Sequence, residues 1–317
     1  LLCFDRVSGQ QVWECELQRG GLMHKSIKNT YASASAACDG HHVYYPWVAD
    51  GALWLAAVNL NGQVLWKKAV APFVSEHGYA SSPCLYGSLV IVSSDNLGPS
   101  FVTAVHRQSG ETVWRAERAT GGSYGTPVVA SLAGRDQLLL SGQNSVVSYD
   151  PQSGDIEWEC PGPGPSTIGT LAWHGNLAYA TCGAPPMIAG VLAIRADSGQ
   201  VAWQAEAMAN VPSPLVVGDR LLITEDRGTV VCFSTESGER LWKERLGGNF
   251  SASPVLAGDR VYLPNEAGRM FVFRVGADFE LVSEIDLDDG GFASPVIAGG
   301  RIYLRTNHHL YCIGDPT

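Results

Sequence analysis

Apolar residues gather in short runs along the chain, and turn residues rich in Gly, Asp and Ser separate these runs. In one stretch, the apolar residues after Pro254 lead to the turn Gly258-Asp259-Arg260, and a second run, Val261-Tyr262-Leu263, follows. A third type of run lies at residues 230–234, and a fourth carries a Trp. Short apolar runs bounded by tight turns indicate β-strands. The pattern therefore predicts units of four short strands, named A to D in chain order, and no helix.

Two local signals repeat in phase with these units. The first is a small residue followed by Pro at the start of strand A. The Pro position, filled by Ala36 and Leu171 in two copies, recurs at 36, 83, 127, 171, 214, 254 and 295, with spacings of 47, 44, 44, 43, 40 and 41 residues. The second is a turn Gly with a Trp four residues later: Gly9 and Trp13, Gly62 and Trp66, Gly110 and Trp114, Gly154 and Trp158, Gly199 and Trp203, Gly238 and Trp242. Gly supplies a positive φ, and Trp supplies a large apolar surface.

Four antiparallel strands in a repeat of this length form a propeller blade, and blades stack because one blade cannot bury both of its faces. We predict an all-β propeller, with residues 1–317 as a single domain. Six complete blades are expected at about 33–70, 81–117, 125–161, 169–207, 212–246 and 252–287. Residues 293–313 and 1–17 are expected to form a seventh, composite blade. Both ends resemble strand C, so an eight-bladed ring whose first half-blade precedes Leu1 remains an alternative.

Composition and charge narrow the possible partners. The 317 residues include 36 Gly and 17 Pro, only 16% are charged, and the net charge is −10. An acidic chain repels a phosphate backbone, so no nucleic-acid partner is expected. No run of about 18 apolar residues occurs, so we expect no transmembrane segment. We expect a monomer.

The turn-and-Trp pattern resembles the tryptophan-docking motif of the pyrroloquinoline-quinone (PQQ)-like propeller repeat, a WD40-like repeat. Asp5-x-x-Ser8-Gly9-x-x-x-Trp13 matches this motif well, as does its copy at residues 150–158, and the resemblance covers essentially the whole chain. The repeat is found in quinoprotein alcohol dehydrogenases, which bind PQQ and Ca²⁺ in an eight-bladed ring. It is also found in the periplasmic lipoprotein of the outer-membrane β-barrel assembly machinery, a protein-binding scaffold, and in bacterial PQQ-binding-like proteins. The resemblance implies a periplasmic or secreted bacterial protein.

The residues that a quinone enzyme needs are missing from the sequence. The dehydrogenases hold PQQ against a disulfide between adjacent cysteines, and no Cys-Cys pair occurs here. No Glu, Asn and Asp set for Ca²⁺ is recognisable by motif, and the haem motif Cys-x-x-Cys-His is absent. The His-Glu-x-x-His motif of zinc proteases and the Walker motif are absent too. We therefore expect neither PQQ nor Ca²⁺, and we predict no catalytic residue and no metal ligand.

The histidine pairs are the most obvious candidates for metal ligands. Consecutive strand residues point to opposite faces, so His308 and His309 are not expected to share an ion. His41 and His42 stand where other units have a solvated turn between strands A and B. For Glu76-His77, just before a strand A, both a loop contact and a catalytic role remain open.

The eight cysteines occupy positions that repeat between units. Cys3, Cys232 and Cys312 share one place in strand C, and Cys15 and Cys160 each follow a Trp by two residues. Equivalent positions in different blades are too far apart for a disulfide. We interpret these residues as small apolar core residues.

The loops that join strand D to the next strand A, and those that join strands B and C, meet at one mouth of a propeller channel. These D–A and B–C loops carry the chemically varied residues, with Trp47 expected on a B–C loop, and the stretches 161–165 and 183–190 enlarge the same face. The residues predicted to bind a ligand are Asn29, Tyr31, Glu76, His77, Asp95, Asn96, Tyr124, Asn249, Asn265 and Glu266. Loops on a rigid scaffold commonly carry recognition.

Two functions are consistent with these residues. The first is a non-catalytic scaffold that binds a protein partner or a small ligand at this mouth. The second is an enzyme at the same mouth, either a divergent PQQ- and Ca²⁺-dependent dehydrogenase or a hydrolase or lyase. The missing cofactor residues favour the scaffold.

Overall fold

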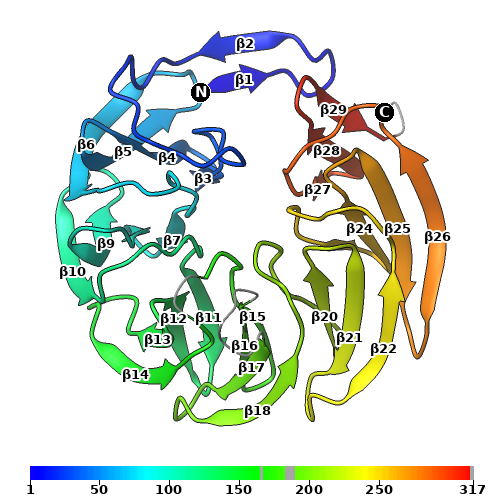
Figure 1. The fold of residues 1–317 in the computed structure, drawn as a ribbon. Coiled ribbons are helices and arrows are strands. Elements are labelled where there is room, and N and C mark those ends of the chain that lie inside the picture. The colour runs from blue at the N-terminus through cyan, green and yellow to red at the C-terminus, as the bar shows by residue number, and fades with distance from the viewer. Residues whose placement is uncertain (165–166, 183–189, 315–317) are drawn as a thin grey trace. The chain divides into compact units, whose positions relative to one another are not determined.

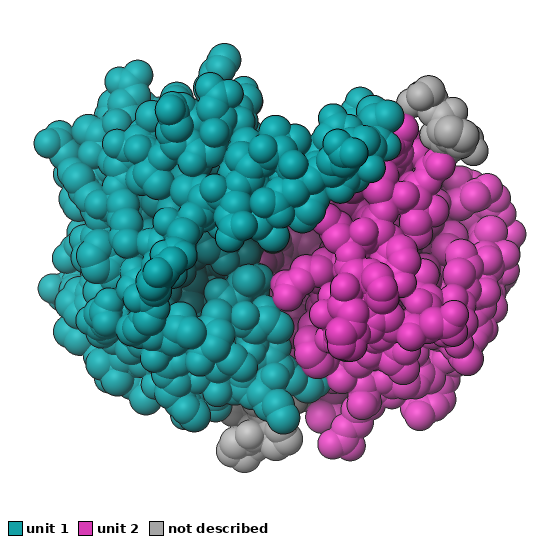
Figure 2. All heavy atoms as spheres, turned by 90° about the horizontal axis from the view of Figure 1, so that it is seen from above, with its two compact units in different colours: residues 1–159 teal, residues 160–317 magenta. Residues whose placement is uncertain are grey.

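Figure 1 shows the computed structural model of the chain, which describes residues 1–164, 167–182 and 190–314. The chain divides into two compact units, Leu1–Glu159 and Cys160–Thr317, coloured separately in Figure 2. The described residues are all strand, turn or loop, so they include no helix that could cross a membrane. The prediction of a single domain over 1–317 stays a prediction.

Unit 1 begins with a two-stranded sheet and continues with three four-stranded antiparallel sheets, in which neighbouring strands follow chain order. The two-stranded sheet is β1 (Leu2–Phe4) and β2 (Gln11–Glu14). The first complete blade is β3 (Ala37–Cys38), β4 (His42–Ala49), β5 (Ala52–Asn59) and β6 (Val64–Pro72). The second is β7 (Cys84–Tyr86), β8 (Leu89–Ser94), β9 (Ser100–His106) and β10 (Thr112–Arg118). The third is β11 (Val128–Leu132), β12 (Arg135–Gly142), β13 (Ser145–Tyr149) and β14 (Ile156–Pro161), and the last two residues of β14 belong to unit 2.

Unit 2 holds three further four-stranded sheets and a three-stranded one. The first blade is β15 (Ala172–His174), β16 (Leu177–Cys182), β17 (Gly190–Arg195) and β18 (Val201–Glu206). The second is β19 (Leu215–Val217), β20 (Arg220–Glu225), β21 (Thr229–Ser234) and β22 (Arg240–Arg245). The third is β23 (Val255–Ala257), β24 (Arg260–Pro264), β25 (Arg269–Val275) and β26 (Phe279–Asp286). The last sheet is β27 (Val296–Ala298), β28 (Arg301–Arg305) and β29 (Leu310–Ile313).

The predicted fold class, an all-β propeller of four-stranded antiparallel blades, is confirmed, and the six complete blades lie where the repeat placed them. The three-stranded sheet β27–β29 and the two-stranded sheet β1–β2 contain the residues that the sequence assigned to the closing seventh blade. Both β29 and β1 are present as strands, in line with the two copies of strand C seen in the sequence.

The core of each unit lies between the faces of successive blades. In unit 1, Tyr44 and Leu53 of the first complete blade pack with Val90 and Val92 of the second. In unit 2, Tyr179 and Val191 pack in the same way with Leu221 and Ile223. These side chains are fully or almost fully buried. Burial of this kind contributes roughly 1.5 to 3 kcal/mol for each large apolar side chain, so inter-blade packing is the main source of stability.

A strand D tryptophan docks on a turn glycine of the next blade. Trp66 in β6 donates its Nε1–H to the carbonyl oxygen of Arg107 at 2.8 Å, and its ring covers Gly110. Gly110 has φ +67°, and a Cβ at this position would lie 2.7 Å from the Trp66 ring. Only glycine satisfies both conditions. The same docking joins Trp13 to Gly62, Trp114 to Gly154 and Trp203 to Gly238.

The small residue before the Pro position has a second role that joins the innermost strands. In unit 1, the hydroxyl of Ser82 accepts the N–H of Ser35 at 2.9 Å, and the hydroxyl of Thr126 accepts the N–H of Ser82 at 3.0 Å. In unit 2, the hydroxyls of Ser213, Ser253 and Ser294 accept the N–H of Thr170, Ser213 and Ser253 at 2.8–3.0 Å. Each hydroxyl thus binds the equivalent residue of the preceding blade.

None of the eight cysteines, all of which lie in the described part of the chain, forms a disulfide. Cys15, Cys160, Cys182 and Cys232 are buried, as a core role requires. Interpreting all eight as core residues is wrong, because Cys38 and Cys312 are exposed.

Replacing Gly110 with Ala tests the docking contact. The new Cβ meets the Trp66 ring, so this substitution should cost about 1 to 3 kcal/mol for overpacking, in addition to about 1 to 2 kcal/mol for a Cβ at positive φ. Gly134→Ala is the matched control, because Gly134 has φ +78° and a Cβ added there would have no other atom within 4 Å. Chemical denaturation measures both variants. Equal losses of stability would show that the Trp66 ring does not constrain the turn.

Candidate functional site

The predicted ligand-binding residues fall into two groups, one in each unit. Asn29, Tyr31, Glu76, His77, Asp95, Asn96 and Tyr124 belong to unit 1, and Asn249, Asn265 and Glu266 belong to unit 2. The predicted insertion at 183–190 lies outside the described residues except for Gly190, and the stretch 161–165 is described only up to residue 164.

The unit 1 group lies on three D–A loops and one B–C loop that contact one another. Ser26 donates its N–H to the carbonyl oxygen of His77 at 3.1 Å, and Leu97 donates to that of Val74 at 3.3 Å. Gly121 donates to the carbonyl oxygen of Asn96 at 2.8 Å. These four loops, residues 15–36, 73–83, 95–99 and 119–127, are called the loop cluster below.

Two buried asparagines hold the backbone of the loop cluster. Asn96 accepts the N–H groups of Val74 at 3.1 Å and Gly98 at 2.7 Å through its Oδ1. Its Nδ2 donates to the carbonyl oxygens of Ser94 and Pro99 at 2.8 and 3.0 Å. Because both the oxygen and the nitrogen of its side-chain amide are hydrogen-bonded to backbone groups, Asn96 fixes one loop against another.

Asn29 acts in the same way between the first two loops of the cluster. Its Nδ2 donates to the carbonyl oxygen of Tyr79 at 3.1 Å, and its Oδ1 accepts the N–H of Tyr31 at 2.9 Å. The bond to Tyr31 supports a backbone with φ 61°, which non-glycine residues rarely adopt. The Tyr31 side chain is thereby presented to solvent, with 41% of its surface exposed.

Asp95 forms a buried ion pair beneath the loop cluster. Its carboxylate binds Arg118 of β10 through two contacts, Nε to Oδ1 at 2.7 Å and Nη2 to Oδ2 at 3.0 Å. Arg118 also donates to the hydroxyl of Tyr149 at 2.8 Å. Burial raises the pKa of Asp95, and Arg118 opposes that rise. Burial alone would lower the pKa of Arg118, but the attraction of Asp95 and Tyr149 outweighs it and raises that pKa, so the arginine is charged.

Glu76, His77 and Tyr124 form the polar surface of the cluster. His77 Nε2 lies 3.9 Å from Glu76 Oε1, and more than two fifths of each side chain is exposed. The rings of His77 and Tyr124 are 6.1 Å apart between centroids. Burial and the charge of Glu76 raise the pKa of Tyr124 to about 12. Tyr124 is therefore a neutral hydroxyl group at physiological pH, suited to hydrogen bonding rather than to proton abstraction.

The unit 2 group repeats this arrangement on a smaller scale. Asn265 is buried and accepts the N–H groups of Ala267 and Arg269 at 3.1 and 2.9 Å. Glu266 accepts the hydroxyl of Ser251 at 2.6 Å and donates its N–H to the carbonyl oxygen of Asn249 at 2.8 Å. Asn249 itself is exposed.

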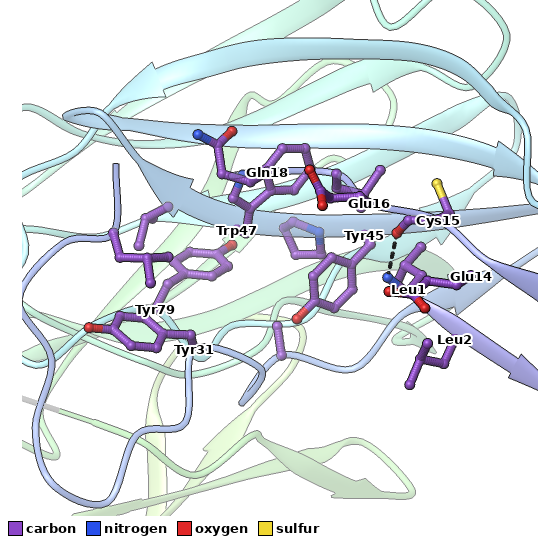
Figure 3. Close-up of a pocket in the computed structure, with 15 residues that line it drawn as sticks. Leu1, Leu2, Glu14, Cys15, Glu16, Gln18, Tyr31, Tyr45, Trp47 and Tyr79 are labelled. Atoms are coloured by element: carbon purple, nitrogen blue, oxygen red, sulfur yellow. Dashed lines mark hydrogen bonds between the residues drawn. The ribbon is translucent and has the colours of Figure 1, made fainter. Parts of the chain in front are cut away.

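Unit 1 also contains a cavity of about 360 Å³ between the loop cluster, the chain start and β4 (Figure 3). One wall is formed by the chain start and by Glu14–Gln18, and the other by Tyr45–Val48 of β4. Tyr31, Ala34 and Tyr79 complete it. Of the ten predicted residues, only Tyr31 lines this cavity.

Sequence reasoning missed most of this cavity. It placed Trp47 on a B–C loop, which is wrong, because Trp47 lies within β4. The sequence does carry a sign that the first complete blade is longer than the others. Its spacing of 47 residues is the largest in the series. The extra length forms the eight-residue strands β4 and β5, joined by the turn Asp50-Gly51.

The donor set for a quinone and its metal is not assembled in the described part of the chain. No group of three or more His, Cys, Asp or Glu side chains that suits a metal ion occurs among these residues. The sequence has no adjacent cysteine pair. Asp95 and Asn96, two of the predicted site residues in unit 1 with side-chain oxygens, already bind Arg118 and the loop backbone. These residues do not fit PQQ with Ca²⁺.

The two histidine pairs, His41-His42 and His308-His309, make different contacts with nearby carboxylates. Asp39 Oδ1 accepts the N–H groups of His41 and His42 at 3.0 and 2.7 Å, which makes this segment a hydrogen-bonded turn. The expectation that His308 and His309 point to opposite faces is wrong. Both lie in the turn between β28 and β29, and both Nδ1 atoms approach the carboxylate of Asp289, at 3.0 and 3.1 Å.

A family model described as outer membrane protein assembly factor BamB matches residues 1–181 and 188–278. A protein of that name from Yersinia pestis is 22% identical over 312 residues, covering 91% of this chain and 72% of the relative. Two other relatives of the same name are spanned over 53% and 41% of their lengths.

Solved structures show the same fold. BamB from Moraxella catarrhalis is 19% identical, with a TM-score of 0.66 over 84% of this chain and 79% of that chain. The quinohemoprotein alcohol dehydrogenase from Comamonas testosteroni is 12% identical, with a TM-score of 0.66 over 93% of this chain and 66% of that chain. At such identities the similarity concerns the fold alone.

Arg118→Met should destabilise the protein strongly, because it leaves the Asp95 charge buried without a partner; the expected loss is about 3 to 5 kcal/mol. Arg135→Met is the matched control. Arg135 also places Nε 2.7 Å from a carboxylate, that of Glu157, but its side chain is 41% exposed against 3% for Arg118. The control should lose at most about 1 kcal/mol. Chemical denaturation measures the free energy of unfolding of both variants. Similar losses would show that the Asp95–Arg118 pair does not support the loop cluster.

Proposed function

The chain belongs to the family of outer membrane protein assembly factor BamB, and we propose that it is a non-catalytic propeller scaffold that binds a protein partner through the loop cluster of unit 1. The periplasm, or the space outside the cell, is the proposed location. The BamB-like relatives and the absence of quinone-binding residues support this proposal over the dehydrogenase alternative.

The observation that carries the proposal is that buried polar residues hold the loop cluster together while other residues on the same loops are exposed. Asn29, Asp95 and Asn96 are buried, and their polar atoms hold the loops together. Tyr31, Glu76 and His77 are exposed on those fixed loops. A surface that is ordered before binding loses less conformational entropy when a partner docks. The arrangement therefore suits recognition.

The exposed residues also suit a protein partner by their chemistry. Tyrosine is enriched at protein interfaces because it combines apolar area with a hydrogen-bonding group. Tyr31 has this character, and the Lys25 ammonium lies 5.0 Å from the centre of its ring. Tyr124 and His77 add a second aromatic pair next to the carboxylate of Glu76. Polar and aromatic groups thus alternate over neighbouring loops, and a protein interface combines the same two kinds of group.

Site-specific photo-crosslinking tests the proposed function. The photoreactive residue p-benzoylphenylalanine replaces Tyr31 or His77 in the full chain, produced in its own host, and mass spectrometry identifies the adducts. We expect the same protein attached at both positions. The control position is Val113 of β10, which is exposed on a strand D away from the cluster. The proposal fails if neither loop position gives an adduct, or if Val113 captures the same protein equally well.

A further inference from the structure

The cavity between the loop cluster and β4 is lined in part by Trp47, and neighbouring side chains hold this residue in a fixed position. Trp47 and Trp54 stack with centroids 6.3 Å apart and ring planes 15° apart. The ammonium group of Lys67 lies 5.3 and 5.1 Å from the two ring centres. Lys67 also donates to the carbonyl oxygen of Leu17 at 2.6 Å. These contacts tie β4, β5 and β6 to the 15–36 loop, so the wall is formed before anything binds.

The polar edge of Trp47 is buried without a hydrogen bond. Its side chain lines the cavity, the residue is 7% exposed, and its Nε1 has no acceptor among the described residues. The neighbouring Trp54 donates to the carbonyl oxygen of Ala49 at 3.1 Å, and the docked Trp13 and Trp66 also have carbonyl acceptors. A buried donor without an acceptor is unfavourable. A ligand that supplies a hydrogen-bond acceptor to the Trp47 Nε1–H would therefore bind favourably.

The backbone of β4 borders the same cavity. Strand β5 pairs with β4 along the whole of His42–Ala49, but β3 pairs only with Val43 and Tyr44. Tyr45, Pro46, Trp47 and Val48, which come next, all line the cavity. An extended peptide matches such a site, because it supplies carbonyl acceptors along its length and a side chain at every second position.

The walls also define the side chain that fits. In Figure 3, Tyr31 and Tyr79 lie toward one end of the cavity, and Leu1, Leu2 and Cys15 lie toward the other. Glu14 and Glu16 border the space as well, and the chain carries a net charge of −10. The volume is near the lower end of the range for ligand sites, about 300 to 1,000 Å³. One or two apolar side chains fit it, and an acidic side chain is disfavoured.

We propose that this cavity binds an extended peptide segment of the partner, which places an apolar or aromatic side chain among Tyr31, Tyr45 and Tyr79 and accepts the Trp47 Nε1–H with a backbone carbonyl. The inference rests on the proposed function in that it takes the partner to be a protein. The inference adds a defined peptide-binding site to the exposed surface of the loop cluster.

Indole N–H resonances in a ¹H–¹⁵N correlation spectrum report on the bond directly. The probes are a blocked hexapeptide, acetyl-Gly-Thr-Phe-Thr-Ser-Gly-amide, and the same peptide with Glu in place of Phe. Trp47→Phe identifies the Trp47 signal and removes its N–H, and Trp54→Phe is the matched control. We expect the Phe peptide to shift the Trp47 signal in a saturable way and the Glu peptide to leave it in place. Trp47→Phe lacks this signal, so its binding is followed through the backbone amide signals of the same spectrum; it should be about three- to tenfold weaker, the usual effect of one lost hydrogen bond.

A second variant tests the cavity itself. Ala34 is 8% exposed and lines the space, so Ala34→Leu should fill it and abolish binding of the Phe peptide while the other indole signals keep their positions. No shift at millimolar peptide, an equal shift with the Glu peptide, or full binding by Ala34→Leu would overturn the proposal. It would also fall if a small molecule released on denaturation were found to occupy the cavity.

The two proposals fail separately. If Tyr31 and His77 crosslink to a partner but the peptide does not bind, the scaffold function stands and the assignment of the cavity falls. If the peptide shifts the Trp47 signal but position 77, which does not line the cavity, gives no adduct, the cavity stands as a peptide site and the exposed surface around His77 is not the docking surface.

Discussion

The contact between a strand D tryptophan and the turn glycine of the next blade is the constraint on which the other features depend. It fixes the distance and rotation between neighbouring blades, because the ring fills the volume that a Cβ on Gly62, Gly110 or Gly154 would need. The indole N–H of Trp66 adds a directional bond to the carbonyl oxygen of Arg107. With the outer edges fixed in this way, hydroxyl groups such as those of Ser82 and Thr126 can join the innermost strands.

Blades held in this way bring the ends of their strands close enough for the loops to bond to one another. Asn29 and Asn96 then each hold a loop from another part of the chain, 50 residues away for Asn29 and 22 for Asn96, and the Asp95–Arg118 pair supports them from below. The loops are thus held in fixed positions by hydrogen bonds and an ion pair. An exposed patch on such loops is a fixed surface, and this is the physical basis for assigning it to recognition.

Most of the fold was predictable from the sequence, because the repeat appears many times and each copy confirms the others. The Trp and Gly positions, the strand order and the six complete blades all followed from it. The site was less predictable. Asp95 and Asn96 have the chemical type of exposed binding residues, but their burial depends on Arg118 and Val74, which lie on other strands and loops. Trp47 was placed on a loop because the 47-residue spacing shows that the first complete blade is longer than the others, but not that β4 and β5 hold the extra residues. The convergence of His308 and His309 on Asp289 required a turn geometry that residue spacing does not reveal.

Hydrogen–deuterium exchange measures directly whether the loop cluster is ordered without a partner, which is the central requirement for a preformed binding surface. The amides of Tyr31, Val74, Gly98 and Ser82 are the ones to follow, because side-chain oxygens of Asn29, Asn96 and Thr126 accept their hydrogens. We expect these amides to exchange far more slowly than an unstructured peptide, and Asn96→Ala to release Val74 and Gly98 while the amides of β8 and β9 stay protected. Exchange of the same amides at the unstructured rate in the unmodified chain would contradict a rigid recognition surface.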